Sequence, residues 1–191
     1  MNKFPRGKVM ALIVSQLRPG RAAALLAPLL LAGCVDSAAP LLTGAQPLFG
    51  PTVRVHGYSL TEGRASGPDV AHFRWDGAQY RAVGRPTFDV ASFTAVPLGG
   101  NDLVIQSRSS RPQVKGIEYA LARKLADGVY LVAAIDEADA DDATRAKFCT
   151  KTGSSSCGLA NSEALLAFAR ATAARPDPKG SLAVIVGGRG R

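Results

Sequence analysis

Three turn signals, each between two runs of β-forming residues, constrain the fold of this chain most strongly. They are Asp76-Gly77, the stretch 99–102 (Gly-Gly-Asn-Asp) and Asp127-Gly128. Asp-Gly and Gly-rich turns accept the positive φ of a tight connection, so each signal predicts a β-hairpin. The expected strand pairs are Ala71–Trp75 with Tyr80–Val83, Ser92–Leu98 with Leu103–Ser107, and Ile117–Lys124 with Val129–Ile135.

Two further strands extend this series. Val53–Leu60 alternates apolar and polar residues, and Ser181–Val186 is a short apolar run near the end of the chain. The sequence therefore predicts an α+β fold: an antiparallel β-meander, forming a sandwich or a small barrel-like sheet, with two C-terminal helices and a final strand. A closed sheet can hold one small apolar ligand, but small barrels are usually packed, so we expect side chains to fill the interior.

The two helices are expected between residues 136 and 176. Acidic residues at 136–142 precede a short helix at Ala143–Cys149, where they favour the positive end of the helix dipole. Their spacing lacks the glycine and glutamate of a calcium-binding loop, so we expect no metal there. The second helix begins near Asn161-Ser162, ends before Pro176, and has one apolar face, formed by Leu165, Phe168 and Ala169.

The chain begins with a basic segment and the apolar run Ala22–Ala32. This run has 11 residues, whereas a membrane-spanning helix needs roughly 20, so it indicates an export signal. The run leads into Leu31-Ala32-Gly33-Cys34. This sequence resembles the lipobox of bacterial lipoproteins, in which a signal peptidase cuts before the cysteine and lipid is attached to it. Either Met1 or Met10 is the start of the signal.

The lipoprotein resemblance implies a division of the chain and a location. Residues 1–33 would be a removed signal peptide, 34–40 a tether, 41–187 a single β-rich domain and 188–191 a flexible tail. Acyl chains on Cys34 would anchor the protein in a membrane, facing the periplasm. In such lipoproteins an aspartate directly after the lipidated cysteine favours retention in the inner membrane. This chain has Val35 at that position, so we expect delivery to the outer membrane. Beyond the lipobox, the sequence has no motif of a named family.

Charge and cysteine usage agree with export. Five of the 23 basic residues and none of the 15 acidic residues precede Cys34, which leaves 18 basic residues and a formal net charge of +3 instead of +8. We therefore expect no nucleic-acid partner. Cys149 and Cys157 are expected to form a disulfide. A metal site completed by His56 and His72 is the alternative, but its spacing is not that of a zinc motif.

Catalytic signals are few. The sequence has no G-x-S-x-G motif. A catalytic pair of carboxylates could form if some of them lie close together in the fold, but their spacing in the sequence gives no reason to expect it; the candidates are Glu62, Asp69, Asp89 and Glu118. We favour a non-catalytic envelope module that binds a protein, glycan or lipid and needs no cofactor. The alternative is a small periplasmic hydrolase, or a lipid or small-ligand carrier, that uses the concave face of the sheet. Its candidate ligand-contacting residues are His56, Tyr58 and His72.

Overall fold

The fold is known from a computed structural model that describes residues 35–61, 64–151, 157–173 and 181–188. The expected signal peptide, the lipobox with Cys34, and residues 189–191 of the expected tail lie outside the described residues. In chain order the elements are β1 (Asp36–Ser37), β2 (Thr52–Thr61), β3 (Arg64–Trp75), β4 (Tyr80–Ala82), β5 (Ser92–Gly99), β6 (Asp102–Arg108), β7 (Ile117–Ala126), β8 (Val129–Ala134), η1 (Glu137–Asp139), α1 (Asp142–Phe148), β9 (Cys149–Lys151), β10 (Cys157–Leu159), α2 (Ser162–Ala173) and β11 (Ser181–Gly188).

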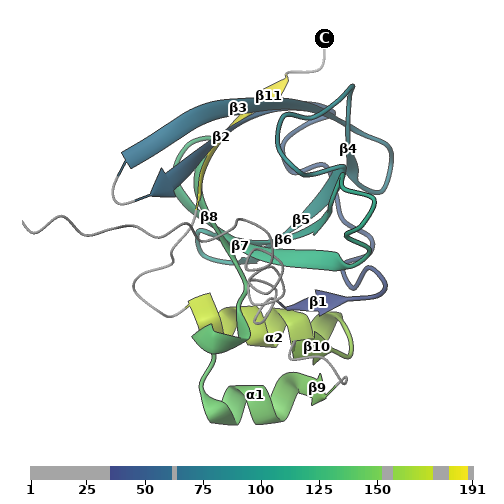
Figure 1. The fold of residues 1–191 in the computed structure, drawn as a ribbon, viewed down its shortest axis with the longest axis vertical. Helices are drawn as coiled ribbons and strands as arrows, with labels where there is room; N and C mark the ends of the chain where they lie inside the picture. The colour runs from purple at the N-terminus through teal and green to yellow at the C-terminus, as the bar shows by residue number, and fades with distance from the viewer. Residues whose placement is uncertain (1–34, 62–63, 152–156, 174–180, 189–191) are drawn as a thin grey trace, which may run out of the picture. The chain divides into compact units, whose positions relative to one another are not determined.

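Eight of the strands close into a barrel, which Figure 1 shows end-on. They follow the order β6-β5-β4-β3-β2-β11-β8-β7, and β6 also pairs with β7, which completes the ring. Every pairing in the ring is antiparallel. The α+β fold with a β-meander is confirmed, and the sheet takes its barrel form.

The strands of the barrel match the turn signals of the sequence. The three expected hairpins are β3–β4, β5–β6 and β7–β8. One strand is longer than expected, because β3 begins at Arg64 and pairs along the whole of β2. A register shift between Gly57 and Ser59 interrupts that pairing, as a β-bulge does. The Ser181–Gly188 strand closes the ring between β2 and β8.

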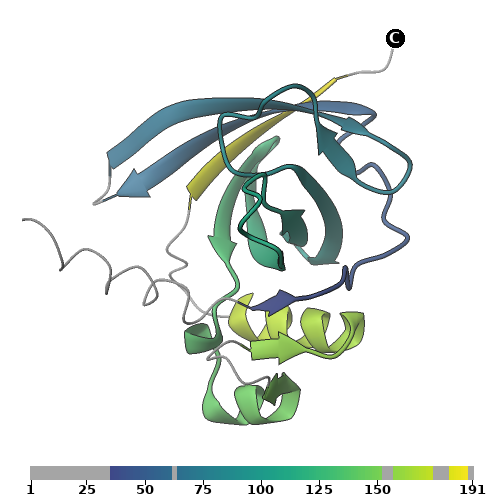
Figure 2. The ribbon, with the colours of Figure 1, turned by 45° about the vertical axis from the view of Figure 1, so that its right-hand side comes forward.

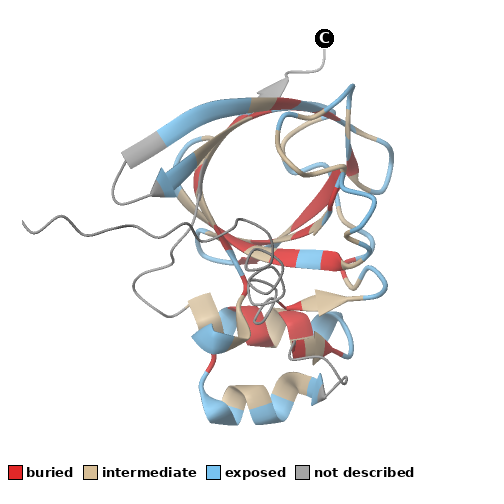
Figure 3. Ribbon diagram, viewed as in Figure 1, coloured by how far each residue is buried: buried red, intermediate tan, exposed pale blue. Residues whose placement is uncertain are grey.

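Helix α2 covers the outer surface of the barrel on the side of β6 and β7 (Figures 2 and 3). The Asn161 side-chain oxygen accepts a hydrogen bond from the Ala164 amide at 2.9 Å, as expected of an N-cap. The predicted apolar face is confirmed, since Leu165, Phe168 and Ala169 are buried. They share a core with outward-facing barrel residues, among them Val104, Tyr119 and Leu121.

Helix α1 lies next to α2, and a disulfide connects its end to the start of β10. The Asp141 carboxylate accepts a hydrogen bond from the Thr144 amide at 2.7 Å, which caps the helix as the acidic sequence predicts. The expected disulfide between Cys149 and Cys157 is confirmed, and it joins the paired strands β9 and β10. None of the described helices is long and apolar enough to cross a membrane.

The segment expected to be a tether is folded from residue 35 onward. Val35 is fully buried, and its amide donates a hydrogen bond to the Ile135 carbonyl at 3.0 Å. Strand β1 follows at once and pairs with β7 and β10. The expectation rested on the small and polar residues of this segment, but one apolar side chain and a two-residue strand are enough to dock it. At the other end, Gly188 still pairs with Thr52 and belongs to β11.

Candidate ligand-binding site

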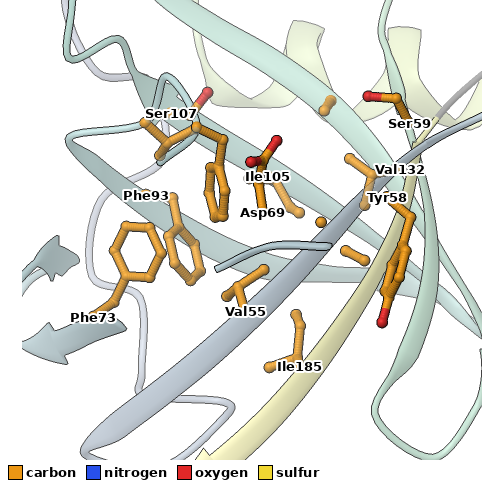
Figure 4. A pocket seen from close by; sticks show the side chains of 15 residues that line it. Val55, Tyr58, Ser59, Asp69, Phe73, Phe93, Ile105, Ser107, Val132 and Ile185 are labelled. Atoms are coloured by element: carbon orange, nitrogen blue, oxygen red, sulfur yellow. The ribbon is translucent and has the colours of Figure 1, made fainter. Parts of the chain in front are cut away.

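The barrel interior contains a cavity of about 290 Å³. This differs from the expectation of an interior filled by side chains. Most of the lining is apolar and comes from strands all around the ring, including Val55, Phe73, Phe93, Ile105, Val132 and Ile185 (Figure 4). Ligand sites in proteins are typically concave, mostly apolar and roughly 300 Å³ or larger, so the cavity has the composition and nearly the size of such a site.

Small residues at inward-facing positions create the space. Gly57, Ala120 and Ala183 line the cavity on β2, β7 and β11. Phe73 on β3 and Phe93 on β5 fill another part of the interior and pack edge to face, with ring centroids 5.0 Å apart. Space therefore remains beside the small residues, where no long side chain is present to fill it.

An aromatic cluster plugs one end of the barrel. Tyr80 is fully buried, and its ring stacks on Phe93 with centroids 4.8 Å apart. Its hydroxyl donates to the Gly50 carbonyl and accepts from the Phe49 amide, both at 2.9 Å. Burial raises the pKa of Tyr80 above its ordinary value. Trp75 and Tyr130 complete the cluster, so ligand entry at this end would require several packed rings to move.

The connection between β4 and β5 supplies part of the cavity wall. Phe88 and Val90 both line the cavity, and a Cβ added to Gly57 would lie 3.8 Å from the Phe88 ring. The Thr87 hydroxyl donates to the Val70 carbonyl at 2.8 Å, which fastens the connection to β3. This segment therefore brings the Phe88 ring against the barrel interior, where its centroid lies 6.0 Å from that of Phe73.

Asp89 holds the same connection to the segment after β6. One of its carboxylate oxygens accepts from the Ser109 and Ser110 hydroxyls at 2.8 and 2.7 Å. The other forms a salt bridge with Arg111. Burial opposes ionisation, but the hydrogen bonds from Ser110 and Ser109 and the Arg111 guanidinium outweigh it and lower the pKa of Asp89 to about 2. The charged carboxylate is thus a fixed link beside two cavity-lining residues.

Few polar groups reach the cavity. Ser59, Asp69 and Ser107 are among the lining residues, and Figure 4 shows the Asp69 carboxylate among the apolar side chains. Asp69 is the one acidic residue of the lining, which includes no basic residue, and it is exposed, as expected at an opening. No histidine or cysteine lines the cavity. The lining residues therefore supply neither the imidazole nor the thiol of a Ser–His or Cys–His pair.

The structure separates the three candidate residues of the sequence. Tyr58 lines the cavity. His56 follows the inward-facing Val55 on β2, and His72 precedes the inward-facing Phe73 on β3. Successive side chains of a strand point to opposite faces, so both histidines belong to the outer face of the barrel. Within the described part of the chain, no group of three or more His, Cys, Asp or Glu residues could hold a metal ion. The hydrolase alternative thus loses the histidines on which it depended.

Other site residues gave no signal of their own in the sequence. Phe88 and Val90 lie in a connection, where no periodicity marks the inward direction. The spacing of Gly57, Ala120 and Ala183 becomes informative only once the register of the strands is known. Comparisons with protein families, with curated proteins and with solved structures gave no match to this chain.

Proposed function

We propose that this protein is a non-catalytic, lipid-anchored component of the bacterial envelope whose barrel binds one small, mostly apolar ligand. The cavity carries the proposal: about 290 Å³ inside a closed barrel, with apolar walls and few polar groups. An engineered apolar cavity of about 150 Å³ binds benzene. A ligand with about ten carbon atoms, such as a short acyl chain or a two-ring aromatic, therefore matches the larger space here.

The gain in free energy comes from removing apolar ligand surface from water. Each buried CH₂ group contributes about 0.8 kcal/mol. The ligand loses translational and rotational freedom on binding, which cancels part of this gain. We therefore expect a dissociation constant on the order of micromolar. A full-length phospholipid, with two long chains, does not fit this volume.

The anchor remains an inference from the Leu31-Ala32-Gly33-Cys34 sequence. Lipid on Cys34 would fix the barrel at the membrane. The valine at position 35 favours the outer membrane, with the barrel facing the periplasm. Metabolic labelling with a radioactive fatty acid tests it. We expect label in the wild type and none in Cys34→Ser. Label retained by the variant would contradict the anchor without touching the cavity proposal.

Ligand binding is tested with 1-naphthylamine, a two-ring fluorophore whose emission shifts in apolar surroundings. Ala120→Leu and Ala183→Leu place larger side chains in the cavity, so each should weaken probe binding about 10-fold. Ala126→Leu is the matched control, because Ala126 is exposed on the same strand as Ala120 and does not line the cavity. Thermal unfolding of all variants separates lost binding from lost folding. Equal probe affinity in the filled and control variants would refute the proposal.

A further inference from the structure

Basic side chains gather on the outer surface of β2, β3 and β4. Arg54 and His72 stand directly opposite each other in the β2–β3 pairing, and Arg74 stands opposite Arg81 in the β3–β4 pairing. All four residues are exposed. In Figures 1 and 2 these strands lie on the side of the barrel away from α1 and α2, so neither of these two helices covers them.

The charge on this surface is largely unbalanced. Arg81 forms a salt bridge with Asp76. Arg54 and Arg74 have no acidic partner among the described residues. An anionic partner would balance the charges of Arg54 and Arg74, because guanidinium groups bind carboxylates with two parallel hydrogen bonds.

A surface hollow of about 400 Å³ lies among these side chains. Its lining includes Thr52, Arg54, His72 and Arg74, together with Val83 and Val186. Each of the two valines is 52% exposed, so apolar surface is accessible beside the arginines. The hollow thus offers cations and apolar contact side by side. The apolar C–H faces and the carboxylates of an acidic sugar require this combination.

Acidic residues gather on the opposite side of the barrel. Asp136, Glu137, Asp139, Asp141 and Asp142 lie in and around η1 and α1. An anionic partner is repelled there and attracted to the β2–β3 surface, so the charge distribution favours a single orientation of approach.

We infer that Arg54, His72 and Arg74 form a second binding site, for an acidic polysaccharide that carries repeated carboxylates. A membrane surface would also attract these cations. However, β1, which begins two residues after Cys34, lies on the helix side of the barrel. An anchor at Cys34 would therefore turn the β2–β3 surface away from its own membrane. This choice of polysaccharide over membrane rests on the proposed anchor.

Binding of the full chain to polygalacturonate, measured by isothermal titration calorimetry in detergent, tests the site. We expect binding that weakens with added salt, and a loss of at least about 10-fold in Arg54→Gln/Arg74→Gln. Arg170→Gln removes an exposed arginine of α2 and should bind as the wild type does. Neutral dextran should not bind.

Two outcomes would overturn the inference. One is equal affinity in the wild type and in Arg54→Gln/Arg74→Gln. The other is a chain that binds phosphatidylglycerol vesicles through both arginines but does not bind polygalacturonate. This result would assign the surface to a membrane. Binding of 1-naphthylamine should be unchanged in Arg54→Gln/Arg74→Gln. Failure of this site and failure of the cavity proposal are therefore distinguishable.

Discussion

The carboxylate of Asp69 gives the otherwise apolar cavity a negative group. No basic side chain lines the cavity to balance it. A negatively charged ligand head group at the opening would be repelled, and a positively charged one attracted. Because Asp69 is exposed, water screens both effects, and each contributes at most about 1 kcal/mol. Together these two effects still give different affinities to ligands that share the same apolar part but carry head groups of opposite charge.

The first prediction compares decylamine with decanoate as competitors of the fluorescent probe. Decylamine should bind about 10-fold more tightly, because attraction and repulsion by Asp69 add up. In Asp69→Asn the ratio should fall to about 2 or less, because decylamine affinity falls and decanoate affinity rises. Added salt should reduce the wild-type ratio in the same direction.

Glu163→Gln is the control for the Asp69 experiment, since Glu163 is an exposed acid on α2. It removes the same charge from the molecule without changing the cavity, and should leave the ratio at its wild-type value. A ratio near 1 in the wild type, or one that survives in Asp69→Asn, would show that ligand charge is not sensed by this residue.

At the scale of elements, the connection between β4 and β5 depends on one ionised group. Asp89 bonds to Ser109, Ser110 and Arg111, and its neighbours Phe88 and Val90 line the cavity. Its pKa is about 2, below the ordinary carboxyl value of 3.8. A lowered pKa means that ionised Asp89 stabilises the folded state above about pH 4, and that this stabilisation is lost as the pH falls toward 2.

The second prediction concerns Asp89→Asn. At pH 7 the substitution should lower the free energy of unfolding by about 1 kcal/mol, after allowance for the partial exposure of the carboxylate. The difference from the wild type should shrink below pH 4 and fall to a small fraction of its pH 7 value near pH 2. Probe affinity at pH 7 should also fall, because Phe88 is held less firmly. Thermal unfolding between pH 2 and 7 measures the stability.

Asp127→Asn is the control for Asp89→Asn. The Asp127 carboxylate is fully exposed and pairs with Lys124 within one hairpin, so its loss should not change probe affinity. A stability difference between Asp89→Asn and the wild type that stays constant from pH 7 to pH 2 would show that the charge of Asp89 does not contribute.

Local signals predicted the elements well and the cavity poorly. The turns at Asp76-Gly77 and Asp127-Gly128 specify their hairpins because few residues accept a positive φ. The α2 face follows from helical spacing alone. Ring closure by β6 and β7 depends instead on partners set by the whole chain. The cavity in the interior depends on which alanines and glycines face inward, and on Phe88 in a connection without periodicity.

At the scale of the whole molecule, the helical layer and the barrel are joined by β1. This strand lies between β7 of the ring and β10 beside the helices. The Ser37 hydroxyl is 2.7 Å from that of Tyr119, and the buried side chain of Val35 belongs to the core that α2 forms with the barrel. Residues that resemble a linker in sequence thus complete the interface between two layers.

The third prediction follows from this role of β1. A chain that begins at Pro40 should be about 3 kcal/mol less stable than one that begins at Val35, because it loses the burial of Val35 and the pairing of β1. Its Tm should fall by several degrees, since about 1 kcal/mol shifts the Tm of a domain of this size by a few degrees. In the chain beginning at Val35, Val35→Ala should cause about half of this loss, and Ala39→Gly, at an exposed position, should cause little. Equal Tm values for the two chains would show that residues 35–39 contribute nothing to the fold and serve as a tether.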